Sequence, residues 1–107
     1  MSRANFRLLV RNLRLMEPQK RLAAIGEQAI VAQAAVAAMR RAQNAHRKHL
    51  NAFYSDHNGS YEGDPHQSDD EQLIALYNVR KDASATARRE RARLRAAINL
   101  HQKEQEQ

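Results

Sequence analysis

The stretch Asp56–Leu73, DHNGSYEGDPHQSDDEQL, separates two long segments that are rich in alanine and charged residues. It holds two of the three glycines and one of the two prolines in the 107-residue chain, and such clusters interrupt helices. Asn58 and Gly59 tolerate the left-handed backbone that ends a helix. Ser68 and Glu71 have the spacing of a capping box, in which they exchange side-chain and backbone hydrogen bonds at a helix start. The stretch therefore predicts a bend between two helices.

The segment before this bend, residues 18–55, has the seven-residue repeat of a helix that packs along another helix. Eight of ten seam positions are apolar, over nearly five heptads. Gly26 lies among them and predicts a close approach of the neighbouring helix, since glycine otherwise costs a helix up to ~1 kcal/mol. The ten seam positions are Leu22, Ile25, Ala29, Ala32, Val36, Met39, Gln43, His46, Leu50 and Phe53.

The segment after the bend, residues 69–105, carries a weaker apolar stripe, which Glu90 interrupts. Folding it back on residues 18–55 gives an antiparallel, coiled-coil-like hairpin of two long helices. Nineteen of the 45 apolar residues are alanine, and Leu, Ile, Val and Phe together number only 20. Because alanine favours helices but fills little core, we expect the hairpin to be completed as a dimeric bundle.

A short segment, residues 3–16, precedes the hairpin and reads as a basic amphipathic helix that ends before Pro18. It contains no acidic residue. An apolar stripe beside a row of arginines suits a groove or an acidic surface on another protein. We therefore expect partner contacts at Phe6, Leu9, Leu13 and Met16, and at Arg3, Arg7, Arg11 and Arg14.

Charge is unevenly distributed along the chain, whose net charge is +6. Residues 51–79 hold six acids and no Lys or Arg, whereas basic segments lie on either side. Fourteen of the 18 basic residues are arginine, which binds phosphate and carboxylate groups in a bidentate manner. A phosphate-binding surface for DNA or RNA is therefore one interpretation, and a solvated face or an acidic protein partner are the others. The candidate phosphate-binding residues are Arg40, Arg41, Arg47, Lys48, Arg88, Arg89, Arg91, Arg93 and Arg95.

Other chemistries find little support in the sequence. A calcium loop that starts at Asn58 would place Gly63 correctly, but Asp69 would replace the bidentate glutamate, so a solvated bend is favoured. His46 and His49 share a helix face and His101 could join them, yet no cysteine or well-spaced carboxylate completes a metal site. No nucleophile elbow or phosphate-binding glycine loop is present. We expect no enzyme activity, no catalytic residue, no cofactor and no metal.

Together these patterns predict one all-α domain, residues 1–107, with a loop at 56–68. No uninterrupted apolar run approaches the ~18 residues of a membrane span, and the basic start lacks the features of a secretory signal. We therefore expect a cytoplasmic protein, whose composition would suit a bacterial or phage accessory gene. The favoured function is that of a non-enzymatic adaptor, inhibitor or assembly factor, which contacts itself and another protein through helices. The alternative is a nucleic-acid-binding accessory protein.

Overall fold

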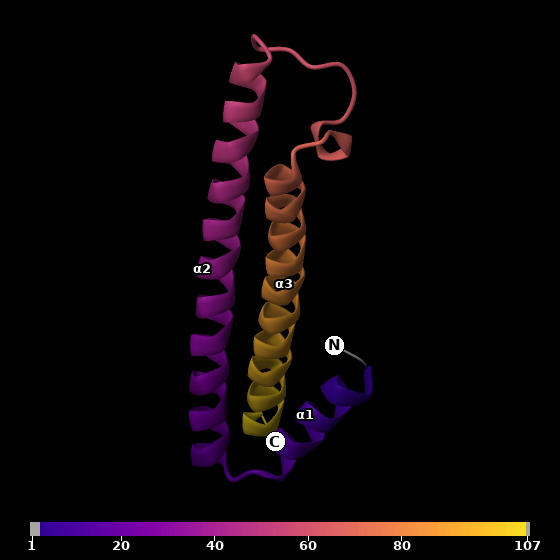
Figure 1. Cartoon of the computed structure of the whole chain (residues 1–107). Helices are drawn as coiled ribbons and strands as arrows, with labels where there is room; N and C mark the ends of the chain where they lie inside the picture. The colour runs from indigo at the N-terminus through magenta and orange to yellow at the C-terminus, as the bar shows by residue number, and fades with distance from the viewer. Residues whose placement is uncertain (1–2, 107) are drawn as a thin grey trace. The chain divides into compact units, whose positions relative to one another are not determined.

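The computed structural model describes residues 3–106, and their side chains from Phe6 onward. It contains three α-helices: α1 (Arg3–Leu15), α2 (Pro18–Asp56) and α3 (Glu71–Gln105) (Figure 1). A single 3-10 turn, η1 (Pro65–Gln67), lies in the connection between α2 and α3. The prediction of an all-α hairpin of two long helices with a short N-terminal helix is confirmed.

The chain divides into two compact units. Unit 1 comprises Met1–Ala35 and Thr86–Gln107, and unit 2 comprises Val36–Ala85. Both α2 and α3 contribute to each unit. In unit 1 the side chain of Gln28 donates to the Glu90 carboxylate, 2.8 Å away. In unit 2 Arg80 donates to His46. Further bonds join Arg21 to His101 in unit 1 and His49 to Asp70 in unit 2. Within each unit the helices therefore pair side by side, and their pairing is antiparallel.

The buried stripe of α2 follows the predicted heptad seam except at its first position, Leu22. The positions spaced by seven from Ile25 are all buried or half-buried, and Ala32, His46 and Phe53 among them are fully buried. In the other predicted set, spaced by seven from Leu22, the later members Ala29, Val36, Gln43 and Leu50 are half-buried. Leu22 itself is exposed, whereas the side chain of Arg21 is buried. A helix averages 3.6 residues per turn, so a repeat of 3.5 only approximates which residues face a neighbour.

The prediction of a close approach at Gly26 is not met within the chain. A Cβ atom built on Gly26 would meet no other atom within 4 Å, and the residue is exposed. This glycine therefore weakens α2 without serving a contact inside the described part of the molecule.

Polar residues end α2 and begin α3. Asn58 and Gly59 adopt positive φ angles of 56° and 82°, and the amide of Gly59 bonds the carbonyl of Tyr54 at 2.7 Å. This is the predicted left-handed helix end. The predicted capping box, by contrast, is wrong. The carboxylate of Asp70 accepts from the amide of Leu73 at 2.9 Å, so Asp70 caps α3 in place of Ser68.

The core is small and contains much alanine. Eight hydrophobic residues are buried in the described part of the chain, and four of them are alanines. In unit 1, Leu13 of α1 packs with Ala97 and Leu100 of α3. Half-buried Leu9, Val10, Ala24 and Ile25 surround this cluster. Thus α1 is attached to the helix pair by the same apolar stripe that the sequence indicated for a partner.

The first of the two long helices, α2, also satisfies a criterion for membrane-spanning helices. By length and composition α2 is apolar enough to cross a membrane. The sequence predicted no membrane span, because polar residues interrupt every apolar run. The alanines of α2 nevertheless raise its mean hydropathy. Only 6% of the apolar 18-residue stretch that meets this criterion is buried in the structure. Core helices of soluble proteins pass the same test, so one such helix is weak evidence for a membrane. The observation does show how little of α2 is covered.

The structure predicts that truncation of Leu73 destabilises the protein. This side chain at the start of α3 is 0% exposed, whereas Val79 on the same helix is 54% exposed. Leu73→Ala should lower the free energy of unfolding by about 2–5 kcal/mol, because a cavity is left in the core. Val79→Ala should change it by about 0.5 kcal/mol or less. Urea unfolding followed by circular dichroism measures both, and equal losses in the two variants would contradict the packing described here.

Candidate functional site

Unit 2 contains a chain of hydrogen bonds that joins α2, the α2–α3 loop and α3. An NH group of Arg80 lies 3.0 Å from Nδ1 of His46. The Nε2 atom of His46 lies 2.8 Å from Nε2 of His66. The Nδ1 atom of His66 lies 2.8 Å from the carboxylate of Asp64. We call these four residues the histidine chain.

Only one arrangement of protons satisfies every bond in the histidine chain. A guanidinium group has donors only, so Nδ1 of His46 accepts from Arg80. The proton of His46 therefore lies on Nε2 and is donated to Nε2 of His66. His66 then carries its proton on Nδ1, which donates to Asp64. Both histidines are neutral in this arrangement, and protonation of His46 would remove the acceptor for Arg80.

The loop positions His66 by local hydrogen bonds and aromatic contacts. Asp64 caps the η1 turn by accepting from the backbone amide of His66 at 2.9 Å, and Pro65 opens the turn. The ring of His66 stacks on that of His46, with centroids 5.0 Å apart. Tyr77 of α3 lies against both rings, at 4.2 Å from His66 and 5.7 Å from His46. His46 is only 2% exposed as a result.

A second contact fixes the start of α3 to α2. The Nε2 atom of His49 lies 2.9 Å from the carboxylate of Asp70, the residue that caps α3. The amide of Leu73 and then the side chain of His49 hold the pKa of Asp70 below its usual value. The backbone and side chain of His66 do the same for the pKa of Asp64.

The pKa of His46 is also lowered, mainly because burial disfavours its charged form. The positive charge of Arg80 lowers this pKa further, and His66 and His49 add smaller contributions in the same direction. Burial and the charge of Arg80 both favour the neutral form of His46, in agreement with the proton arrangement above.

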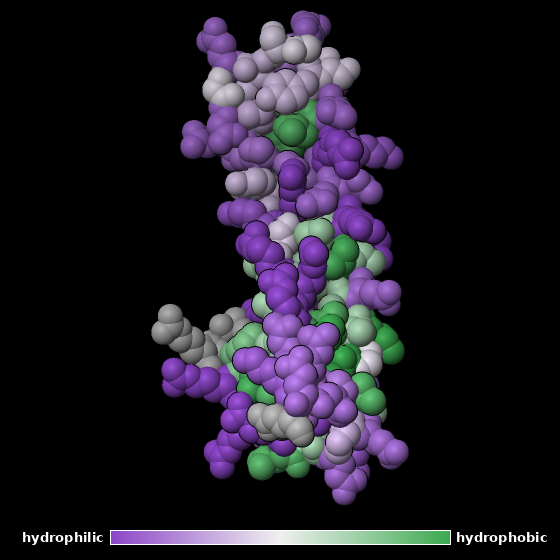
Figure 2. All heavy atoms as spheres, turned by 180° about the vertical axis from the view of Figure 1, so that it is seen from behind, coloured by the Kyte–Doolittle hydropathy of each residue, from purple (hydrophilic) through white to green (hydrophobic). Residues whose placement is uncertain are grey.

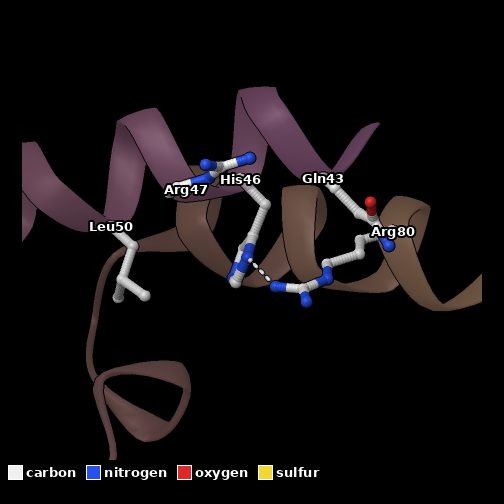
Figure 3. A pocket seen from close by; sticks show the side chains of 5 residues that line it. All are labelled: Gln43, His46, Arg47, Leu50 and Arg80. Atoms are coloured by element: carbon white, nitrogen blue, oxygen red, sulfur yellow. Dashed lines mark hydrogen bonds between the residues drawn. The ribbon is translucent and has the colours of Figure 1, made fainter. Parts of the chain in front are cut away.

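A pocket of about 290 Å³ opens beside the histidine chain (Figure 3). Gln43, His46, Arg47 and Leu50 of α2 and Arg80 of α3 line it. Figure 3 shows the guanidinium of Arg80 pointing toward His46, with the amide of Gln43 beside the Arg80 side chain. The head group of Arg47 is exposed and donates to Asn44 on its own helix at 2.6 Å.

The predicted partner-binding residues of α1 have different surroundings. Leu13 is buried and Leu9 is half-buried in the core of unit 1, so substitution of Leu13 would test packing rather than partner binding. Phe6 is half-buried and Met16 is exposed. Arg7, Arg11 and Arg14 are exposed, and Arg14 lies 3.8 Å from Glu104. The side chain of Arg3 lies outside the described ones. Leu8 and Leu15, which the sequence analysis did not select, are the large apolar residues that α1 exposes.

Most of the predicted phosphate-binding residues are exposed, and the structure distributes them over both units. Arg93 is the half-buried member, and its Nε atom is buried without a hydrogen-bond partner. None of the nine forms an ion pair with a carboxylate among the described residues. Exposed in unit 2 are Arg40, Arg41, Arg47 and Lys48, and exposed in unit 1 are Arg88, Arg89, Arg91 and Arg95.

The structure does not assemble the predicted histidine trio or a calcium loop. His101 accepts from the Nε atom of Arg21 in unit 1, at 3.1 Å. In the loop, the carboxylates of Asp64 and Asp70 bind His66 and His49 instead of converging on a cation. Among residues 6–106, no group of three or more His, Asp or Glu side chains is placed to hold a metal ion.

Sequence reasoning missed three members of the histidine chain: Asp64, His66 and Arg80. His66 and Asp64 lie inside the loop that was treated as a bend, and Arg80 lies outside every basic cluster. The Asp-Pro-His order was an available signal, because Asp before Pro favours a turn in which the Asp side chain accepts from the amide two residues later.

The pKa of His46 predicts a dependence of stability on pH. The unfolded chain takes up a proton at His46 near pH 6.5, whereas the folded protein takes it up only at a lower pH. The contribution to stability is therefore complete above about pH 6.5 and is lost as the pH falls through the lowered pKa of the folded state. The lowered pKa values of Asp64 and Asp70 also stabilise the folded protein, and this contribution is lost at a more acidic pH, below the usual carboxyl pKa near 3.8.

The comparison is between the wild-type protein and His46→Asn, whose side-chain oxygen can still accept from Arg80 but does not titrate. Urea midpoints measured at pH 7.5 and 5.5 should fall more in the wild-type protein than in the variant. The other histidines are common to both proteins, so equal falls would show that His46 does not cause the effect.

The site thus combines a fixed, neutral histidine pair with an arginine beside a small pocket, an arrangement that can bind and orient an anionic group. Comparison of the chain with protein-family models, with curated proteins and with solved structures finds no match.

Proposed function

We propose that this chain is a non-enzymatic interaction protein, an adaptor, inhibitor or assembly factor, that binds an acidic helical partner through unit 1. The observation that supports this is the concentration of exposed apolar side chains there. Eight large hydrophobic residues are exposed in the described chain, and Val79 alone belongs to unit 2. The others are Leu8, Leu15, Met16, Leu22, Ile30, Val31 and Ile98.

These side chains are not isolated on the surface. Leu22, Gly26 and Ile30 follow one another at intervals of four residues, so they form a ridge along the outer side of α2. Gly26 leaves open space on this ridge, which would allow another helix to approach closely. Figure 2 shows apolar side chains, in green, exposed between hydrophilic ones. Burial of each Leu or Ile contributes about 1.5–3 kcal/mol, and clustered exposure of this kind is typical of interaction sites.

The charge of unit 1 indicates what kind of partner fits. Its sequence contains twelve Lys and Arg residues against five Asp and Glu residues, which gives a net charge of +7. On α3, Arg91, Leu94, Arg95 and Ile98 line a depression of about 250 Å³, where cationic and apolar groups alternate. A helix that carries leucines beside glutamates would complement both features. A second copy of unit 1 would bring like charge to the same face, so an acidic partner is favoured over self-association.

The first test uses a fluorescent acidic amphipathic peptide with leucines spaced at four residues and glutamates between them. The double variant Leu22→Gln, Ile30→Gln should bind it at least about tenfold more weakly than wild type, since two apolar anchors are lost. Val79→Gln, an equally exposed position in unit 2, is the matched control and should bind normally. Anisotropy titrations give the affinities. Unchanged binding by the double variant would refute the ridge as a docking surface, and light scattering of the wild-type protein reports self-association.

Nucleic-acid binding is the second candidate, because one observation favours it. Arg88, Arg91 and Arg95 are exposed at intervals of three and four residues, so they form one row on α3, and none has a carboxylate partner among the described residues. Such a row could follow a phosphate backbone.

Simultaneous substitution of these three arginines by alanine tests this candidate. Binding to labelled single- and double-stranded oligonucleotides should weaken equally for all sequences. The slope of the logarithm of affinity against the logarithm of salt concentration should become flatter, by an amount that corresponds to about two to three lost phosphate contacts. If the wild-type protein shows no binding at physiological salt, the candidate fails and the arginines remain available to an acidic protein.

A further inference from the structure

The charge of Arg80 is not neutralised by any described residue. Its side chain is half-buried, and its hydrogen-bond partner is His46, which is neutral. The other basic residue of the pocket, Arg47, bonds the neutral side chain of Asn44. None of the described residues that line the pocket is a carboxylate. In the described part of unit 2, the two carboxylate pairs, at Asp64 and Asp70, involve histidines only.

A half-buried guanidinium without an anion is unfavourable, because removal from water is compensated only when an opposite charge is near. We propose that the pocket lined by Gln43, His46, Arg47, Leu50 and Arg80 binds a small oxyanion, namely inorganic phosphate or the phosphate of a small phosphomonoester. Arg80 is the anchor of this site.

The surroundings of Arg80 hold it in place for this role. One N–H group of its guanidinium donates to His46, and four N–H groups remain for an oxyanion. His46 is itself fixed by His66, which Asp64 and Tyr77 position. The anion would thus meet an arginine that is already oriented, which reduces the entropy lost on binding.

Two residues of α2 supply further contacts. The amide of Gln43 lies beside Arg80 and can donate to an oxygen of the anion (Figure 3). Arg47 is exposed at the pocket, where its long side chain can exchange its bond to Asn44 for a charged one, which is roughly twice as strong as a neutral hydrogen bond.

The size of the pocket selects a small ligand. Its volume of about 290 Å³ is at the lower end of the range for ligand pockets. A phosphate group and its hydration fit this space, whereas a dinucleotide would not be enclosed.

The site belongs to unit 2 and uses none of the residues of the proposed partner surface in unit 1. Phosphate binding and peptide binding are measured in separate experiments on different variants. Failure of either proposal therefore leaves the other standing.

The experiment is a titration of the whole chain with inorganic phosphate and with pyrophosphate, in a chloride buffer free of other oxyanions. Calorimetry gives the affinity, and amide shifts in nuclear magnetic resonance spectra locate the site. Arg80→Met keeps most of the aliphatic stem but removes the charge, and it should weaken binding about tenfold or more. Lys81→Met is the control. This substitution removes the same charge from the adjacent position, but Lys81 is exposed and does not line the pocket.

The proposal is overturned if the wild-type protein shows no saturable binding. It is also overturned if Arg80→Met and Lys81→Met weaken binding equally, which indicates diffuse attraction. If Arg80→Met loses its helical circular dichroism, Arg47→Met takes its place, because this residue is exposed and lines the same pocket. It should then weaken binding severalfold, and unchanged affinity would again reject the site.

A single-stranded oligonucleotide with hydroxyl ends distinguishes a small-anion site from a nucleic-acid surface, since it offers only phosphodiesters. The proposal expects inorganic phosphate to bind without competition from this oligonucleotide. If the oligonucleotide binds through Arg80 and inorganic phosphate does not, the pocket is part of a nucleic-acid surface and the small-anion site is rejected.

Discussion

Four of the eight hydrophobic residues buried in the described chain are alanines of α2 and α3, and this limits how much apolar area the two helices can bury. Ala32 and Ala42 are buried on α2, and Ala87 and Ala97 are buried on α3. Each alanine contributes one methyl group, so the helices can lie close together but gain little from each contact. Larger side chains are needed elsewhere to define the fold. In unit 1 these are supplied by α1, whose Leu13 packs with Leu100.

Unit 2 uses aromatic and hydrogen-bonding side chains for the same purpose. Phe53 packs against Tyr54, His57 and Tyr61, with ring centroids 4.3–5.9 Å apart. The histidine chain and the contact of His49 with the cap of α3 then join the loop to both helices. Directional bonds specify one arrangement where apolar contacts alone would permit several, because an unsatisfied buried group would be costly. The acidic character of residues 51–79 follows in part from this role, since Asp64 and Asp70 are the acceptors.

Much of the fold could be predicted because it depends on local patterns. Asn58 and Gly59 predict a helix end because they tolerate left-handed backbone, which is a property of those residues alone. The prediction of Ser68 as the cap is wrong, because Asp70, two residues later, also has a side-chain oxygen that can accept from an amide. Only tertiary contacts decide which of the two residues caps the helix. The site was harder to predict. His46 and His66 meet because the η1 turn brings the loop back onto α2, and nothing in the spacing of twenty residues indicates this. Arg80 had no signal at all, since one arginine in a long helix is ordinary.

The choice of histidine as the partner of Arg80 has a further consequence for the pocket. A carboxylate at position 46 would neutralise Arg80 at every pH above its own pKa, and the pocket would then lose the positive charge of its anchor. A neutral imidazole orients the guanidinium without cancelling its charge, so the positive potential of the pocket is retained at neutral pH. Acidification does not simply add to that potential. Once His46 is protonated, Nδ1 becomes a donor, and two cations then face each other across the 3.0 Å contact. His66 and Asp64 hold the other side of the ring, so His46 cannot turn away without breaking its bond to the loop. The orientation of Arg80 and the attachment of the loop are therefore lost together, and an anion bound at Arg80 would oppose that loss by supplying the missing negative charge.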